Sequence, residues 1–186
     1  MSAGLHLTVQ EFEQMVKCGA FDHLNRSVEL IHGELREMNP AGPLHDDLVM
    51  YLTNWSAAVL LNEPISITSQ TGLDLGELSS RPEPDLLWVR QARYRDRHPN
   101  ASDVKLAIEV SDSSLQNDLN EKSALYAQAG IVEYWIVDAM AAKVHVHRSP
   151  GSGQYTDQTI VNTDKEVRPL ILPRATLVVA DLFAAD

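Results

Sequence analysis

An acidic residue interrupts an otherwise apolar run in the middle of the chain. Glu109 lies among Val104, Leu106, Ala107, Ile108 and Val110. A run of this kind is typical of a β-strand that is covered on both faces. Because an ionised carboxylate is rarely buried without a partner or a metal ion, the charge of Glu109 requires a neutralising group. The sequence therefore predicts a buried strand that carries a paired or metal-bound acid.

Two other residues are candidates to meet Glu109. Asp85 lies 24 residues earlier, at the mouth of a second apolar strand, so the two acids can meet only if their strands are neighbours. A helix is expected over about residues 115–129, and Lys122 falls on its apolar stripe, which consists of Leu115, Leu119, Tyr126 and Ala129. The lysine should therefore point inward, toward the two carboxylates.

This set of residue types is suited to a metal site. Asp85 and Glu109 offer the hard oxygen ligands that Mg²⁺ or Mn²⁺ requires. The ammonium of Lys122 could orient an attacking water and stabilise the charge of a phosphoryl transition state. Hydrolysis of a phosphodiester is the chemistry that these residues favour. The alternative is a structural buried ion pair without chemistry, which has the same sequence signature.

Composition limits the fold and the location of the protein. A chain of 186 residues with 44% apolar content is long enough for one well-packed domain, so we expect a single domain over residues 1–186. No segment approaches the ~20 apolar residues of a membrane span, and the N-terminus lacks a cationic segment followed by an apolar one. A cytoplasmic protein is expected. The one cysteine, Cys18, excludes an intrachain disulfide and is interpreted as a packing residue.

Charge gives conflicting indications about nucleic acid. The formal net charge of −11 argues against indiscriminate binding, which depends on phosphate neutralisation by Lys and Arg. Five of the fifteen basic residues nevertheless flank the Asp85 strand within seventeen positions: Arg81, Arg90, Arg93, Arg95 and Arg97. They could form a rim that contacts phosphates. The alternative is a solvent-exposed loop, which the polar residues around them also indicate.

The remaining patterns predict an alternation of helices and strands. Thr8 and Glu11 form a capping box for a helix over residues 8–18. A hairpin is expected over 27–38 and a long amphipathic helix over 45–61. Further strands are expected in the following segments: 65–70, 72–75, 84–89, 104–110, 132–138, 143–148 and 154–161, with a last strand or short helix within 170–183.

Several residues outside the proposed site have simpler interpretations. Tyr134 and Trp135 are expected in the core, and Asp138 should cap the turn after its strand. His145 and His147 share one face of an alternating strand and could ligate a metal, but a polar outer face explains them without one.

Motifs spread over most of the chain resemble a known family. They are residues 27–35, His45, 83–89, 108–111, Asp118, Lys122, Tyr126, Gly130 and 133–138. Together they are similar to the Uma-two family of restriction-endonuclease-like proteins, within the PD-(D/E)xK nuclease superfamily. The resemblance covers roughly residues 8–183. It implies an α/β fold with a restriction-endonuclease-like core, in which helices flank a central mixed β-sheet, and here with an added β-hairpin extension.

The resemblance also assigns roles to residues. The superfamily usually carries a lysine two positions after the second acid, where this chain has Ser111, so the lysine role would move to Lys122. Asp85, Glu109 and the backbone carbonyl of Val110 would hold the metal. Glu29 and His45 would support these ligands, or would be a paired strand acid and a histidine at a helix start.

The expected function is hydrolysis of DNA phosphodiester bonds by an endonuclease that depends on Mg²⁺ or Mn²⁺. A homodimer is expected as well, because related nucleases often cut paired strands. The competing hypothesis is a catalytically silent nucleic-acid-binding or scaffold protein that retains the nuclease fold. An intact set of two acids and a lysine favours the enzyme, whereas the net charge favours weak affinity for nucleic acid.

Overall fold

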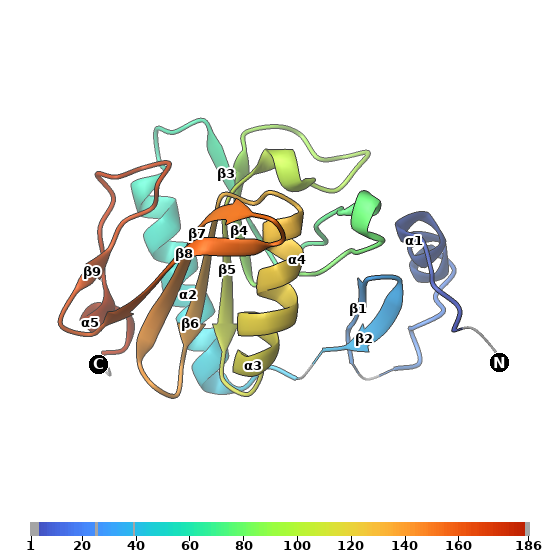
Figure 1. Cartoon of the computed structure of the whole chain (residues 1–186), viewed down its shortest axis with the longest axis horizontal. Coiled ribbons are helices and arrows are strands. Elements are labelled where there is room, and N and C mark those ends of the chain that lie inside the picture. The colour runs from blue at the N-terminus through green and yellow to red at the C-terminus, as the bar shows by residue number, and fades with distance from the viewer. Residues whose placement is uncertain (1–3, 25, 39, 185–186) are drawn as a thin grey trace.

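A six-stranded mixed sheet forms the centre of the protein, as expected from the sequence (Figure 1). The computed structural model describes residues 4–24, 26–38 and 40–184. The strand order is β3-β4-β5-β6-β7-β8, and only β5 and β6 run parallel. The strands are β3 (Ile65–Ser69), β4 (Leu86–Arg90), β5 (Val104–Ser111), β6 (Glu133–Asp138), β7 (Lys143–Gly151) and β8 (Gln154–Asn162).

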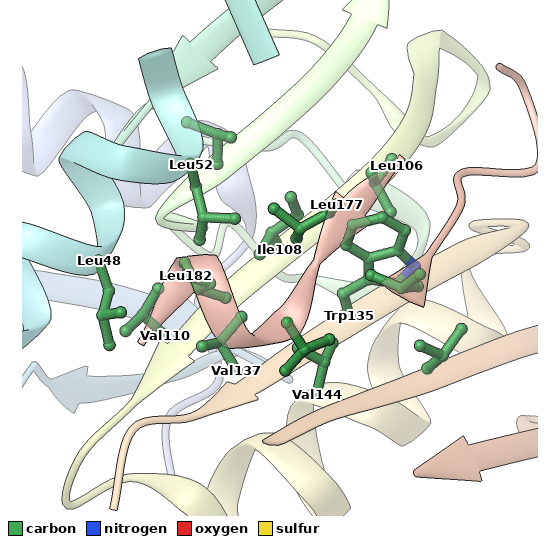
Figure 2. Close-up of a cluster of buried hydrophobic side chains, with 14 of the residues drawn as sticks. Leu48, Leu52, Leu106, Ile108, Val110, Trp135, Val137, Val144, Leu177 and Leu182 are labelled. Atoms are coloured by element: carbon green, nitrogen blue, oxygen red, sulfur yellow. The ribbon is translucent and has the colours of Figure 1, made fainter. Parts of the chain in front are cut away.

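Helices cover both faces of this sheet. The long helix α2 (Pro43–Val59) lies on one face, and α4 (Ser123–Gln128) lies on the other (Figure 1). Leu48 and Leu52 of α2 point toward Ile108 and Val110 of β5 (Figure 2). Ala107, on the opposite side of β5, packs with residues of α4. The predicted two-sided burial of β5 is therefore confirmed, and Glu109 faces α4 because side chains alternate along a strand.

The crossover from β5 to β6 departs from the regular α-helix that the sequence predicts over 115–129. It consists of α3 (Leu115–Asn117), a π-helical turn η3 (Asp118–Lys122) and α4. A π turn has more residues per turn than an α-helix, which changes which side chains share the inward face. Asp118 and Lys122 of this turn are both buried, and so is Tyr126, four residues after Lys122.

The N-terminal elements lie beside the main sheet. They are α1 (Val9–Lys17) and a separate hairpin of β1 (Val28–Ile31) and β2 (Glu34–Glu37) (Figure 1). The predicted capping box of Thr8 and Glu11 is present. Cys18, expected to pack, is exposed at the end of α1. None of the helices in the described part of the chain has the length and apolar character that a membrane crossing needs.

Shorter elements complete the fold. They are the 3₁₀ turns η1 (Gly76–Leu78) and η2 (Ala101–Asp103), the strands β9 (Glu166–Val167) and β10 (Leu177–Val178), and the helix α5 (Val179–Leu182). Leu177 and Leu182 pack into the core on the α2 face (Figure 2). The strand expected over 72–75 is absent: this described segment makes only isolated bridges, Asp74 with Asn100 and Leu75 with Ser80.

The hairpin of β7 and β8 continues the central sheet. Its turn lies at Ser152 and Gly153, whose positive φ angles of 52° and 77° suit a tight two-residue hairpin turn. Because the strands pair up to this turn, with Gly151 opposite Gln154, both are longer than expected. At the preceding corner, Asp138 Oδ1 accepts a hydrogen bond of 2.9 Å from the Ala141 N–H, as predicted. Tyr134 and Trp135 are fully buried, as expected.

The polar outer face expected for His145 and His147 is wrong, because both side chains are buried. His147 Nδ1 lies 2.9 Å from Ser123 Oγ of α4. Burial lowers the pKa of His147 to about 4, and the neighbouring His145 contributes to this shift. His147 is therefore a neutral core residue at ordinary pH.

This burial predicts a loss of stability in acid. The unfolded chain binds a proton at His147 below about pH 6.5, whereas the folded protein resists protonation down to about pH 4. The free energy of unfolding should therefore fall by on the order of 3 kcal/mol through this window because of His147. We expect His147→Gln to lose less stability than the wild type between pH 7 and pH 4.5, measured by urea unfolding. The same change at the exposed His23 should leave the wild-type pH dependence intact, and an equal loss in the His147 variant would contradict the prediction.

Candidate active site

A cleft of about 470 Å³ opens where β4 begins and β5 ends. The hairpin β1–β2, the start of α2 and the turn η3 contribute to its walls. Six ionisable residues with buried side chains line it: Glu29, His45, Asp85, Glu109, Asp118 and Lys122. They come from segments that are far apart in the sequence, and the pairing of β4 with β5 brings the two central acids together.

Strand register places Asp85 beside Glu109. Leu86 pairs with Ile108, so the residue before β4 lies next to the residue after Ile108. Asp85 N–H donates to Glu109 Oε2 over 3.4 Å, and Val110 N–H donates to Asp85 Oδ2 over 2.8 Å. The two carboxylates are thus connected through the backbone of both strands.

Lys122 reaches the same point from the helical side. Its Nζ lies 3.0 Å from Glu109 Oε1 and 3.5 Å from Glu29 Oε2. Tyr126 O–H donates to the same Glu109 oxygen over 2.8 Å. The side chain of Lys122 is only 8% exposed, so its ammonium interacts with these acids rather than with solvent. The structure therefore brings Asp85, Glu109 and Lys122 into one cleft, as the sequence leads one to expect.

Acidic side chains outnumber basic ones in this cluster. Burial raises the pKa of Glu109 to about 8, although Lys122 opposes the shift, and Asp85 and Asp118 raise it further. Burial also raises the pKa of Glu29. Burial would lower the pKa of Lys122, but Glu109 and Glu29 raise it above its ordinary value. The cluster therefore holds four buried acids, Glu29, Asp85, Glu109 and Asp118, against two buried basic residues, Lys122 and His45.

The donor set of the cleft suits a hard divalent cation. Asp85 and Glu109 supply carboxylate oxygens. The Val110 N–H points toward Asp85, and in an extended strand the carbonyl of the same residue points to the same side. β4 starts at Leu86, so no residue of β4 lies opposite Val110 to accept or donate a sheet hydrogen bond there.

Among the described residues, no group of three His, Cys, Asp or Glu side chains is arranged to hold a metal ion by itself. Mg²⁺ suits such a partial site, because it keeps several water ligands.

Glu29 and His45 both contact this cluster. His45 Nε2 lies 3.1 Å from Asp85 Oδ1, near the start of α2. This hydrogen bond raises the pKa of His45 to about 9, against the effect of burial. Glu29 Oε2 accepts a hydrogen bond of 3.4 Å from Glu83 N–H in addition to its contact with Lys122. Both residues are therefore placed to support the groups that line the cleft.

The sequence patterns predict no role for Asp118 and place Tyr126 in the apolar stripe. Asp118 is 2% exposed, and its Oδ2 accepts from Ser111 Oγ over 2.7 Å and from Ser114 Oγ over 2.5 Å. Ser111, which stands where the superfamily has its lysine, therefore orients an acid. The four-residue spacing from Asp118 to Lys122 to Tyr126 is the sequence signal that points to this polar line.

The expected rim of phosphate-contacting arginines does not lie at the cleft. None of the following residues lines it: Arg81, Arg90, Arg93, Arg95 and Arg97. Arg90 and Arg97 pair with Asp103, at the other end of β5, with distances of 2.9 and 2.6 Å. Arg81 is buried and pairs with Glu83. The five arginines are therefore not part of the cleft wall, and their contact with phosphates stays a prediction.

Comparisons with known proteins agree with the fold. The model of the Uma2 family, described as "Putative restriction endonuclease", matches residues 9–180. A solved structure described as a putative nuclease belonging to DUF820, from Anabaena variabilis ATCC 29413, is similar with a TM-score of 0.73. The similarity covers 95% of this chain and 97% of that chain at 16% identity, so it concerns the fold. No curated protein matches the sequence. The family match spans nearly the whole chain and confirms the resemblance seen in its motifs: the chain belongs to the Uma2 family.

Proposed function

We propose that this protein is a divalent-metal-dependent endonuclease that hydrolyses phosphodiester bonds in DNA. Four buried acids face two buried basic residues, Lys122 and His45, in an open cleft, and this is the observation that carries the proposal. A purely structural ion pair is expected to balance its own charge, because an uncompensated buried charge is costly. An additional cation is therefore the simplest complement to Asp85 and Glu109. The family's description and the nuclease-like fold support the same function.

Each residue of the cluster then has a role. Asp85, Glu109 and the backbone carbonyl of Val110 would hold Mg²⁺ or Mn²⁺. When bound, such an ion offsets charge on phosphoryl oxygens and lowers the pKa of coordinated water. Lys122, fixed by Glu109, positions the attacking water and offsets the charge that develops on the phosphate. The oxygen of water forms a bond to phosphorus while one P–O ester bond breaks. The products are a phosphate monoester and an alcohol that has taken up a proton.

A second candidate function is a catalytically silent nucleic-acid-binding or scaffold protein with the same fold. The net charge of −11 and the placement of three arginines in pairs away from the cleft favour it, because both weaken attraction for phosphate. The two candidates differ in whether the cleft binds a divalent ion and whether nucleic acid is cut.

Ion binding and cleavage are tested together with Asp85→Asn, which removes a charge at nearly constant size. Millimolar Mg²⁺ or Mn²⁺ should raise the melting temperature of the wild type, because an ion that binds only the folded state stabilises it by mass action. The variant should lose this shift and should cleave DNA at least about 100-fold more slowly. Titration calorimetry, melting curves and cleavage assays on single- and double-stranded DNA and RNA provide the measurements.

Asp157→Asn is the matched control, since Asp157 is an exposed acid on β8 away from the cleft. It should bind the ion and cleave as the wild type does. If calorimetry finds no binding of either ion and no nucleic acid is cut, the scaffold function replaces the nuclease.

Lys122→Met separates the charge of the lysine from the packing of its stem. The change leaves Glu109 and Glu29 buried without their cation, so we expect a loss of about 3–5 kcal/mol in the free energy of unfolding. Cleavage should also fall by orders of magnitude under conditions in which the variant is still folded. Lys122→Arg, which retains the charge, should recover most of the stability. Urea unfolding and cleavage are measured side by side, and a folded Met variant with wild-type cleavage would refute the catalytic role.

We also propose a homodimer as the cleaving unit. Each chain has one such cleft among its described residues, and cutting both strands of a duplex at one site needs two. Sedimentation velocity at micromolar concentration should give the mass of two chains, with or without duplex DNA. A monomer under both conditions would restrict the proposed activity to one strand at a time.

A further inference from the structure

Arg36 is the arginine that lines the cleft among the described residues, and it lies on β2 in the hairpin wall. Its side chain is 39% exposed, whereas that of Lys122 is 8% exposed and engaged by two carboxylates. His45 is occupied by Asp85. Arg36 is therefore the cation that an anion entering the cleft meets first.

Two carboxylates fix the guanidinium of Arg36 at the mouth of the cleft. Nη1 lies 2.6 Å from Glu34 Oε2 on the same strand, and Nη2 lies 3.1 Å from Glu121 Oε1 on η3. Glu121 directly precedes Lys122, so the Arg36–Glu121 pair bridges the hairpin and the helical turn that carries the buried lysine. A guanidinium has five N–H donors, and these two contacts leave donors for a further acceptor.

We infer that Arg36 binds a backbone phosphate of the nucleic acid at the mouth of the cleft, an inference that rests on the proposed nuclease function. The planar guanidinium fits the geometry of a phosphate and forms paired, charge-assisted hydrogen bonds with it. A contact to phosphate carries no sequence information, so this residue contributes affinity and register on the strand.

The pairing with Glu121 makes the contact competitive. A phosphate that takes the Nη2 donor displaces the carboxylate of Glu121, which also repels the phosphate electrostatically. Removing the charge of Glu121 should therefore strengthen binding, whereas removing the charge of Arg36 should weaken it. If the Arg36–Glu121 pair were only structural, losing either partner would change DNA affinity in the same direction. Opposite effects of the two substitutions on affinity therefore indicate phosphate binding by Arg36.

The test uses Arg36→Gln and Glu121→Gln in the Asp85→Asn background, which prevents turnover. Binding of a fluorescent DNA oligonucleotide is followed by anisotropy at several salt concentrations. Arg36→Gln should weaken binding roughly tenfold and reduce the salt dependence by about one phosphate contact. Glu121→Gln should tighten binding several-fold. Arg36→Lys should recover part of the affinity, because it keeps the charge without the planar fork.

Arg168→Gln is the matched control. Arg168 forms the same kind of pair two residues apart in the sequence, with Glu166 at 2.6 Å, has 53% exposure, and does not line the cleft. It should bind DNA as the parent does. If Arg36→Gln and Arg168→Gln bind equally well while the parent binds DNA, the inference is overturned and the proposed function stands.

A parent protein that binds no DNA and a wild type that cuts none would overturn both proposals. Melting curves confirm that each variant is folded. If Arg36→Gln does not fold, the comparison of Arg36→Lys with the parent decides the outcome: unchanged affinity would count against the contact.

Discussion

The buried contact between Lys122 and Glu109 is the interaction on which the site depends. It joins the central strand of the sheet to the helical crossover over 3.0 Å, and both partners are withdrawn from water. Because Glu29 competes for the same ammonium, the lysine cannot fully neutralise either acid. The buried acids of the cluster outnumber its two buried basic residues, Lys122 and His45. This distinguishes it from the pair of Arg148 with Glu133, in which a guanidinium makes two hydrogen bonds to one buried carboxylate oxygen.

The π turn gives this contact its geometry. A π turn has more residues per turn than an α-helix, so it rotates the side chains that follow it relative to those that precede it. Asp118, Lys122 and Tyr126 can then all face β5, and each makes a polar contact there. Local departure from α-helical geometry is frequent at functional sites. Here it accompanies three polar groups that all reach the β5 side of the crossover.

The sequence predicts the site best where a charged residue lies in a segment that must be buried. An acid within an apolar run has few explanations, so Glu109 identified both the central strand and the site, and helical periodicity turned Lys122 inward. Periodicity could not reveal the π turn, because the apolar residues Leu115, Leu119, Tyr126 and Ala129 already recur at α-helical spacings. The pairing of Arg90 and Arg97 with Asp103 depends on the path of a loop, so proximity in sequence to Asp85 was misleading. The segment 72–75 has a strand-like composition but lacks a strand to pair with.

The hairpin β1–β2 lies outside the main sheet, although it forms part of the cleft wall. Its backbone is joined to the rest of the chain through few hydrogen bonds, such as Leu30 with Arg81 and Gly33 with Ser79, and most of β2 is solvent-exposed. Substitutions on β2 can therefore alter the shape and charge of the cleft without disturbing the packed core. The fold thus places Asp85, Glu109 and Lys122 on the packed core and part of the cleft wall on a hairpin outside the main sheet, so β2 can change in sequence during evolution while the core stays the same.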